Sequence, residues 1–469
     1  MEQQIPAYTA KTMTKEQFFY AYKQFTEDSG EHVLLESGRD GNLSIAGINP
    51  LATLQALDGY YLQITWRDGT KEVRKGDPLE LLTEFVASYK VDFIPELPEF
   101  QGGTLGFISY DYVRRYENLP NDTIDDLDTP DLFFYLFDEW AVLDVQTDTA
   151  YFITLAGSGV SPDDVAMKWE QASLSGLADQ LFTKADGTEQ QDDLDVSVTG
   201  LEFEQMVQDV QSYIADGDVI QVNLSVRQSK KLTVNPLEMY EALRVVNPSP
   251  YMASIGAKDF SVVSSSPELL LKKRGSELST RPIGGTRPRG ASTEEDLAYE
   301  KDLLSDDKEI NEHRTLVDLE KEDFERVCAD GTVETNEFMV IERYSHVMHL
   351  VSNVRGTAAD NMSNAAIVKG VFPGGTITGA PKLRTMEIIE ELEPAKRGLY
   401  TGSIGWFGFN GDFELNVVIR TAYIKDGIAH IQAGAGLVAD SVPKNEYLES
   451  LAKGKALWQA KAMAESIRY

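Results

Sequence analysis

The chain has 469 residues, of which 42% are hydrophobic, and its formal net charge at pH 7 is −33. This length is sufficient for one large domain or two ordinary ones, each with a substantial core. The acidic balance argues against a general surface for nucleic acid or for anionic membrane lipids, because both require clustered lysine and arginine.

The sequence shows no pattern typical of export or of membrane insertion. No apolar run approaches the roughly 18 residues that a membrane-spanning helix needs. The polar start Met1-Glu-Gln-Gln lacks the basic and apolar segments of a signal peptide. The single cysteine, Cys328, excludes an intrachain disulfide framework and suits a reducing compartment. We therefore expect a cytoplasmic protein.

The first half of the chain is typical of short strands separated by turns. Residues 32–46 predict two strands around a glycine turn, and the segments 102–110 and 132–137 are further apolar runs. Residues 184–196 are polar and acidic and show no periodicity, which predicts a linker. We therefore divide the chain into region 1–183, linker 184–196 and region 197–469.

The second half is predicted to begin with a helix followed by a strand. Thr199 and Glu202 have the spacing of a capping box, and apolar residues recur at helical intervals until Gly217. Residues 218–227 then alternate between apolar and polar side chains, which predicts a strand with one polar face. That face is either solvated or lines a site.

Two Glu-x-x-Glu pairs stand out, Glu309 with Glu312 and Glu446 with Glu449. Residues three apart share one face of a helix, so each pair can direct two carboxylates at one point. In so acidic a chain, a single pair of this kind is more often a solvated surface face. Hard oxygen ligands of this kind are also what magnesium prefers.

A pair of histidines, His346 and His349, also lies three residues apart. With one cysteine and five histidines in the chain, the sequence offers no convincing ligand set for zinc.

A glycine-rich stretch, residues 372–382, precedes the helix-like segment 383–392. Thr378 ahead of Pro381 predicts the start of the helix. Free amides at such a start favour an anion, so a carboxylate or phosphate ligand is one expectation and a tight turn without a ligand is the other. Arg420, which we expect within an apolar strand, needs a partner of opposite charge, either a side chain or a ligand.

These stretches together resemble a known family. Phe372–Lys382, Tyr400–Trp406 and the run 417–420, with Leu34-Leu-Glu-Ser37 and Asn247–Met252, are similar to the chorismate-utilising enzymes that include component I of anthranilate synthase and of aminodeoxychorismate synthase. The resemblance extends over essentially the full chain. It implies an α+β fold like that of anthranilate synthase component I, with large antiparallel β-sheets packed as a sandwich and helices on the outside.

The resemblance also implies roles for individual residues. Glu268 would be the general acid, His349 would lie beside the substrate ring, and Thr376 would complete the catalytic group. Mg²⁺ would be held by Glu312 and Glu449, with support from Glu309 and Glu446. The enolpyruvyl carboxylate of chorismate would be bound by Tyr400, Arg420, Gly434, Ala435 and Gly436, with Lys453 nearby. A tryptophan pocket, inhibitory in some members and structural in others, would be formed by Glu36, Ser37, Pro250, Tyr251 and Met252.

Three departures from the family pattern refine this expectation. Gly284 stands where some members carry a nucleophilic lysine, so ammonia would have to add directly. Gln221 stands where members that add water carry a lysine base, which argues against isochorismate or salicylate formation. In the segment 320–325, Glu322 replaces an asparagine found in most relatives.

The implied activity is amination of chorismate with ammonia from a glutamine amidotransferase subunit. The glycine-rich loop and residues 397–406 look closer to members that aminate C4, giving 4-amino-4-deoxychorismate for 4-aminobenzoate and folate. Formation of anthranilate and pyruvate is the alternative, and a non-catalytic tryptophan-binding regulatory subunit is a third possibility. Cys328 lacks the glycine-flanked turn of an activated nucleophile, so we expect glutamine hydrolysis on another polypeptide.

Overall fold

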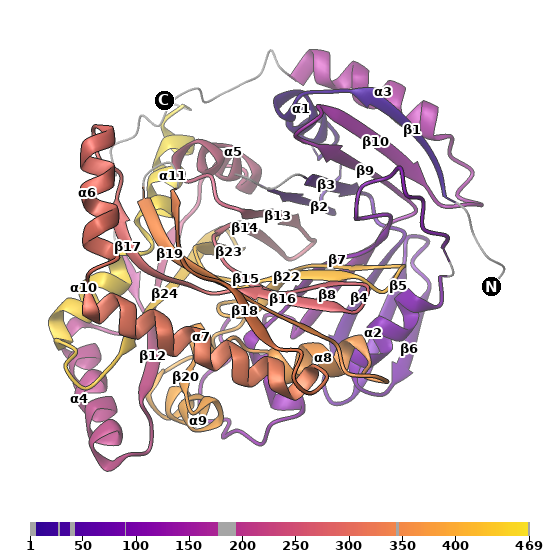
Figure 1. Ribbon diagram of the computed structural model, residues 1–469. Coiled ribbons are helices and arrows are strands. Elements are labelled where there is room, and N and C mark those ends of the chain that lie inside the picture. Colours follow the sequence, from indigo (N-terminus) through magenta and orange to yellow (C-terminus); the bar gives the residue numbers. More distant parts are fainter. Residues whose placement is uncertain are drawn as a thin grey trace.

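Two twelve-stranded antiparallel sheets form the framework of the molecule, with helices on their outer sides (Figure 1). The computed structural model describes residues 6–26, 29–37, 43–89, 91–176, 194–343 and 347–467. The α+β sandwich expected from the sequence is confirmed.

The first sheet brings together strands from both halves of the chain. Its order is β1 (Ala7–Thr12), β10 (Thr149–Thr154), β9 (Glu139–Asp144), β3 (Leu43–Ile48), β2 (His32–Glu36), β13 (Tyr251–Gly256), β14 (Phe260–Ser266), β23 (Thr421–Lys425), β24 (Ile428–Leu437), β12 (Gln221–Lys231) and β11 (Asp195–Val196), and β20 (Gly379–Ala380) also pairs with β12.

The second sheet also combines strands from both halves of the chain. Its order is β17 (Ile283–Pro288), β19 (Val347–Thr357), β16 (Glu277–Arg281), β15 (Leu269–Arg274), β22 (Phe413–Asn416), β21 (Ser403–Gly408), β7 (Gly103–Ile108), β8 (Leu132–Leu136), β4 (Ala52–Leu57), β5 (Tyr61–Trp66) and β6 (Lys71–Lys75), and β18 (Glu334–Arg343) pairs with β19. The predicted division at 184–196 therefore does not separate the two sheets. Residues 177–193 lie outside the described residues, and Asp195–Val196 already belong to β11.

The core between the sheets is rich in aromatic rings. Phe260 on β14 packs edge-on against Phe107 on β7 and Phe133 on β8, with ring centroids 5.7 and 5.1 Å apart. Because such rings bury large apolar areas, they hold the two sheets face to face. A second core lies on the other face of the first sheet, beneath α1 (Lys15–Thr26), α3 (Pro162–Gly176), α5 (Pro236–Val246) and α11 (Lys455–Ser466).

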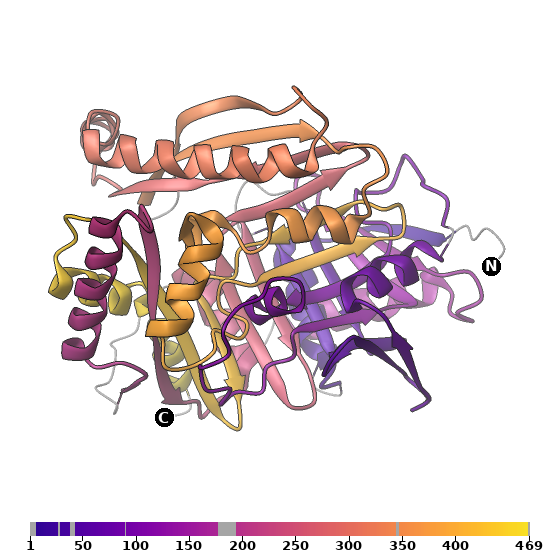
Figure 2. The ribbon, with the colours of Figure 1, turned by 90° about the horizontal axis from the view of Figure 1, so that it is seen from below.

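The remaining helices cover the other faces, as the view in Figure 2 shows. They are α2 (Pro78–Ala87), α4 (Gly200–Asp216), α6 (Thr293–Leu303), α7 (Asp307–Val327), α8 (Asn364–Val371), α9 (Lys382–Leu392) and α10 (Pro443–Ala452). Of these, α4 and α10 pack together beside β12 and β24, whereas α7 packs across β17 and β19.

The predicted unit of helix and strand at the start of the second half is present. Thr199 and Glu202 form both hydrogen bonds of a capping box at the start of α4, and Gly217 ends the helix with a left-handed φ of 81°. On β12, the polar side chains of Gln221, Asn223 and Ser225 are buried rather than solvated.

The predicted start of the helix after the glycine-rich loop is wrong. Thr378 does not cap α9, because its hydroxyl donates to the carbonyl oxygen of Gly374 at 3.0 Å. Gly379 and Ala380 first pair with β12 as β20, and α9 begins only at Lys382 after Pro381, which makes no side-chain cap. Pairing with the sheet edge therefore replaces capping here.

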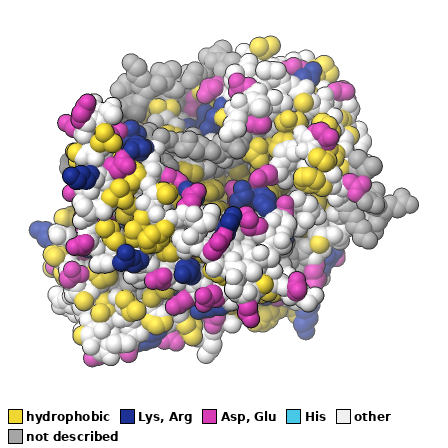
Figure 3. Space-filling model, in the orientation of Figure 1, with side chains coloured by type: hydrophobic (Ala, Val, Ile, Leu, Met, Phe, Trp, Pro, Cys, Tyr) yellow, Lys and Arg dark blue, Asp and Glu magenta, His cyan; other side chains and the backbone are white. Residues whose placement is uncertain are grey.

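The surface agrees with the composition. On the face seen in Figure 3, acidic side chains are spread widely and lysine and arginine are interspersed among them. Within the described part of the chain, no helix combines the length and apolar character that a membrane span requires.

Candidate active site

Glu268 lies where the chain leaves the first sheet at the end of β14 and enters the second at β15. Its side chain is buried, and its backbone carbonyl accepts a hydrogen bond from the Val417 amide at 3.0 Å. Burial raises the pKa of Glu268 to about 7, against opposing contributions from the Thr376 hydroxyl, the Arg420 guanidinium and the Ile283 amide. A carboxyl group that keeps its proton near neutral pH is suited to general acid catalysis.

Arg420 lies at a second crossover between the sheets, and the expectation that it sits within an apolar strand is wrong. It occupies the bend between β22 and β23 and has a left-handed φ of 49°. Its carbonyl oxygen accepts the Ser265 amide at 3.1 Å, which fixes the bend against the end of β14. A left-handed backbone conformation costs a residue with a Cβ about 1 kcal/mol, and strain of this kind is concentrated at functional sites. Arg420 and Glu268 thus meet where two crossovers run side by side.

His349 projects from β19 toward the same place. Its Nδ1 lies 3.0 Å from the Thr286 hydroxyl and 3.3 Å from the carbonyl oxygen of Gly285. A carbonyl only accepts, so the proton of the neutral ring belongs on Nδ1. Burial and the nearby charge of Arg420 lower the pKa of His349 to about 4, so the ring is neutral at physiological pH.

Thr376 lies in a single 3₁₀ turn, Gly375–Ile377, beneath which Leu319 of α7 packs against Gly375. Its hydroxyl is buried and has no hydrogen-bond partner of normal geometry among the described residues, although it is close enough to lower the pKa of Glu268. A buried hydroxyl without a partner is costly, and a bound substrate oxygen would relieve that cost.

The residues expected to bind a carboxylate lie on the first sheet. Gly434, Ala435 and Gly436 are part of β24, where Gly434 pairs with Ser225 of β12. A Cβ at Gly434 would lie 2.4 Å from the Leu224 carbonyl oxygen, so glycine is required by the close approach of the two strands.

Two further predicted residues border this strand. Tyr400 is buried, and the Arg397 guanidinium lies over its ring at 5.5 Å. Lys453, at the end of α10, donates to the Gly434 carbonyl oxygen at 2.8 Å and pairs with Glu449 at 2.9 Å.

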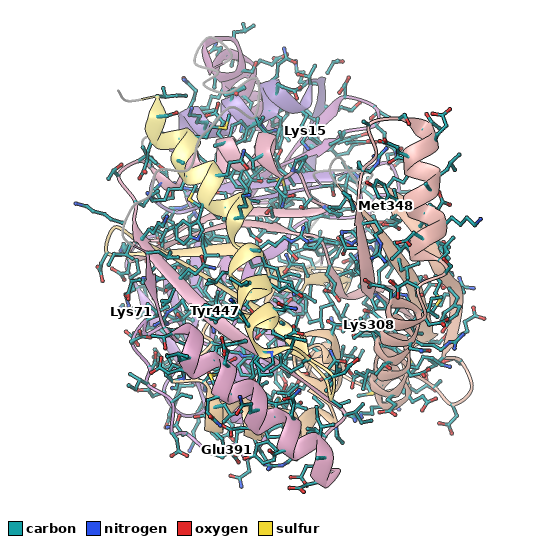
Figure 4. The ribbon with its side chains drawn as sticks, turned by 90° about the vertical axis from the view of Figure 1, so that its left-hand side faces the viewer. Lys15, Lys71, Lys308, Met348, Glu391 and Tyr447 are labelled. Atoms are coloured by element: carbon teal, nitrogen blue, oxygen red, sulfur yellow. The ribbon has the colours of Figure 1, made fainter. Side chains whose placement is uncertain are left out.

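The four predicted metal-binding glutamates approach one another from two helices. Glu309 and Glu312 lie in the first turns of α7, and Glu446 and Glu449 lie on α10. Figure 4 labels Lys308 and Tyr447 on these two helices. Burial, Glu309 and Glu449 raise the pKa of Glu312, whereas Lys308 and Lys453 lower it. The carboxylates therefore repel one another across the gap between α7 and α10.

This donor set fits a hard divalent cation. Within the described ranges, no three His, Cys, Asp or Glu side chains are grouped closely enough to hold a metal by themselves. Magnesium usually keeps several waters and takes only one or two protein carboxylates, with further oxygens from the substrate. A cation between Glu312 and Glu449 would also offset the repulsion from Glu449 that helps to raise the pKa of Glu312.

The five residues of the predicted tryptophan pocket line one cavity of about 840 Å³ between the sheets. Glu36 forms part of its wall and is already paired: it accepts from Arg244 Nε at 2.8 Å, Arg244 Nη2 at 3.1 Å and the Tyr240 hydroxyl at 2.8 Å. These donors hold the pKa of Glu36 below its ordinary value despite burial. The cavity is within the size range of small-molecule sites, and Pro267 and Leu269, which flank Glu268, also line it.

The departures from the family pattern have clear structural settings. A Cβ at Gly284 would lie 2.5 Å from Nδ1 of the buried His313, so no lysine fits there without moving that ring. Gln221 is buried beside Gly436. Glu322 is exposed on α7. His346 lies outside the described residues.

Sequence reasoning missed the residues that hold the predicted ones in place. Arg287 binds Glu309 at 3.0 Å and also pairs with Asp302 and Asp306. The buried pair of Arg397 and Glu393 fixes the segment that carries Tyr400. Arginines next to glycine-rich or aromatic motifs were the available signal, but their partners are distant in sequence.

Comparisons with known proteins agree with this geometry. A family model described as chorismate binding enzyme matches residues 30–459. The chain is 47% identical to aminodeoxychorismate synthase component 1 of Bacillus subtilis (strain 168), over 99% of both chains. It is 41% identical to anthranilate synthase component 1 of Pseudomonas putida, over 93% of this chain and 91% of the relative. Among solved structures, anthranilate synthase component I from Streptococcus pneumoniae TIGR4 superposes with a TM-score of 0.77 at 34% identity, covering 89% of this chain and 92% of that one.

Proposed function

The chain belongs to the family of chorismate-binding enzymes, and from this membership we propose that it catalyses the reaction of aminodeoxychorismate synthase component 1. In that reaction ammonia replaces the C4 hydroxyl of chorismate and gives 4-amino-4-deoxychorismate. The observation that carries the proposal is the 47% identity to such a protein along 99% of both chains.

Glu268 supplies the proton in this proposal. Hydroxide is a poor leaving group, so protonation of the C4 oxygen as it departs lowers the barrier. Burial keeps the proton on Glu268 up to about pH 7. The Thr376 hydroxyl and the neutral His349 ring lie around the same point and are available to orient the substrate ring.

The enolpyruvyl carboxylate is assigned to Arg420, Tyr400 and the β24 backbone at Gly434–Gly436. Arg420 lies close to both Glu268 and His349, as its effect on their pKa values indicates. Its permanent positive charge suits a carboxylate ligand. Glu312 and Glu449, supported by Glu309 and Glu446, would hold Mg²⁺. Bound Mg²⁺ would fix the ring carboxylate of chorismate and neutralise its charge.

Ammonia is proposed to come from a separate glutamine amidotransferase subunit. The single cysteine, Cys328, is buried, and burial raises the pKa of its thiol to about 11, the opposite of an activated nucleophile. Because the ring of His313 fills the space beside Gly284, no lysine fits at this position. Ammonia therefore adds directly to the substrate and not through a lysine intermediate. We further propose that the protein works in the reducing environment of the cytoplasm. The ligand proposed for the 840 Å³ cavity is tryptophan.

Formation of anthranilate is the second candidate. It is favoured by the 41% identity to anthranilate synthase component 1 of Pseudomonas putida and by the absence of a lysine at Gly284. The third candidate, a non-catalytic tryptophan-binding regulatory subunit, is motivated by the changed segment 320–325. Within that segment Glu322 and Glu325 are exposed, whereas Glu320 is buried.

One product analysis separates these candidates. The purified chain is incubated with chorismate, magnesium and ammonium, and the products are separated by chromatography. We expect 4-amino-4-deoxychorismate without pyruvate. Anthranilate with an equal amount of pyruvate would assign the second activity, and unchanged chorismate would leave a binding role.

A further inference from the structure

A second buried carboxyl group, Glu320, lies close to Glu268 and is not used by the proposed mechanism. Glu320 lies on α7, directly after Leu319, which packs beneath the turn that carries Thr376. It is only 3% exposed, and its Oε2 has no hydrogen-bond partner among the described residues. An unpaired carboxyl at such depth is costly unless it keeps its proton.

The groups around Glu320 come from four elements. The Thr280 hydroxyl approaches it from β16, Asp323 from its own helix, Lys382 from the start of α9 and Glu268 from the junction of β14 and β15. Burial, with Asp323 and Glu268, raises the pKa of Glu320 to about 8, whereas Lys382 lowers it.

The single cation facing Glu320 in this set is already shared. Lys382 Nζ binds Asp323 Oδ2 at 2.5 Å and the Val371 carbonyl oxygen at 2.7 Å. Arg326 lies 3.6 Å from the other oxygen of Asp323, and Tyr116 lies near the same carboxylate. Glu320 is therefore left as the neutral member of the group.

Residues next to the two carboxyls are hydrogen-bonded to each other across β15 and β16. Thr280, whose side chain faces Glu320, donates to the carbonyl oxygen of Leu269, the residue after Glu268, at 3.3 Å. Around Glu268 itself stand Arg420, Thr376 and the Ile283 amide. Of the groups that face Glu268 or Glu320, only these two are carboxyls without an ion pair of normal geometry in the described structure.

We propose that Glu320 is a proton-supplying residue that returns a proton to Glu268 in each turnover. This inference rests on the proposed function, in which Glu268 gives its proton to the departing C4 hydroxyl and becomes a carboxylate. A proton then moves from the carboxyl of Glu320 to that carboxylate. Glu320 is left ionised, with Lys382 to stabilise the charge, and recovers its proton from solvent before the next turnover. One O–H bond breaks and one forms, so atoms and charge balance.

The test uses the full chain with saturating chorismate, magnesium and ammonium. Glu320→Gln keeps the shape of the side chain but holds no transferable proton. We expect kcat to fall about tenfold or more while KM for chorismate stays within about twofold, because only proton supply is removed. Glu320→Asp, which retains a carboxyl, should recover a substantial part of the rate. Glu322→Gln, on the exposed side of α7, is the matched control and should behave as the unmodified chain.

The pH profile distinguishes proton supply from a structural role. The unmodified chain should lose activity through two ionisations on the basic side, and Glu320→Gln should lose one of them. Unchanged kcat and an unchanged profile in Glu320→Gln would overturn the inference. If this happened while Glu268→Gln was inactive, the proposed function would stand and only the role of Glu320 would fail.

If Glu320→Gln does not fold, the protonation of Glu320 can still be measured in the unmodified chain and in Glu268→Gln. Infrared difference spectra between pH 6 and pH 9 report protonated buried carboxyls directly. One carboxyl that loses its proton in the unmodified chain should be missing from the spectra of Glu268→Gln, and a second should remain there. Finding Glu320 ionised at pH 6, as a single titrating carboxyl that vanishes in Glu268→Gln, would also overturn the inference.

Discussion

Lys453 donates a hydrogen bond to the carbonyl oxygen of Gly434 at 2.8 Å and at the same time pairs with Glu449 at 2.9 Å. One side chain thus ties the helix that carries half of the proposed magnesium site to the strand proposed to bind the enolpyruvyl carboxylate. A displacement of either element is transmitted to the other, so metal and substrate binding are expected to depend on each other.

Replacing Glu268 by glutamine is expected to abolish amination and leave chorismate binding intact. The change removes the proton donor and keeps the volume of the side chain. Turnover should fall well beyond tenfold, the change produced by about 1.4 kcal/mol in the barrier. Chorismate affinity is measured by equilibrium binding. A variant that retained more than about a tenth of the turnover would argue against the role of Glu268.

The same substitution should make the protein more stable at alkaline pH. The native chain keeps the proton of Glu268 up to about pH 7, whereas the unfolded chain releases it near the ordinary value of 4.5. The native state therefore binds more protons in this window, and the free energy of unfolding falls as the pH rises through it. Glu268→Gln escapes this fall, which amounts to about 3 kcal/mol. Urea unfolding of both proteins at pH 4.5 and pH 8 measures the difference, which should be present at pH 8 and largely absent at pH 4.5.

Removing either proposed metal ligand should increase the magnesium requirement. Glu312→Ala and Glu449→Ala each delete a hard anionic ligand, so the magnesium concentration for half-maximal activity should rise at least about tenfold. Glu322→Ala, on the exposed side of the same helix as Glu312, is the control. Identical magnesium titrations for all three variants would assign the two Glu-x-x-Glu pairs to the surface.

The use of glutamine as the nitrogen source should depend on a second polypeptide. The isolated chain should convert chorismate with ammonium and not with glutamine, because the thiol of Cys328 is buried and its pKa is raised. Adding the amidotransferase subunit should restore glutamine use. Glutamine-dependent product from the isolated chain that persisted in Cys328→Ser would contradict this prediction.

The stability of the protein should depend on the ion pair between Glu36 and Arg244 in the wall of the 840 Å³ cavity. Arg244→Met leaves the buried carboxylate of Glu36 without its cation and should cost about 3–5 kcal/mol in the free energy of unfolding. Adding Glu36→Gln to that variant should recover much of the loss, because the unpaired charge is then gone. Chemical denaturation of the single and double variants measures both effects.

The sequence predicted the parts of the fold that depend on neighbours along the chain. The capping box at Thr199 and Glu202, the stop at Gly217 and the strand expected over 218–227 all follow from local chemistry. Each is confirmed, with the strand observed at Gln221–Lys231. Thr378 was misjudged because the segment after it pairs with β12, a partner far away in sequence. No local pattern encodes such pairing.

The site shows the same limit. The spacing of the two Glu-x-x-Glu pairs was visible in the sequence, but the roles of these glutamates and of Glu268 came only from the resemblance to a family. The repulsion between Glu312 and Glu449 depends on how the fold places α7 and α10, which no local pattern encodes. Arg420 was expected inside a strand because Val417, Val418 and Ile419 precede it, yet all three belong to a crossover between the sheets, in which Val417 and Val418 are buried and Ile419 is partly buried. Glu320 lies in the changed segment 320–325, but its burial has no local sequence signal, because on α7 it is one acidic residue among many.

The sharing of both sheets between the two halves has a consequence during synthesis on the ribosome. β7 pairs with β21, and its residues Gly103–Ile108 must wait for Ser403–Gly408, about 300 residues later. At ordinary translation rates this delay is roughly 15–60 s. Throughout it the apolar strands of the first half have unpaired edges, which favours association with other nascent chains. We therefore expect a fragment that ends near residue 183 to be insoluble on its own, and yield of the full chain to rise when chaperones are abundant.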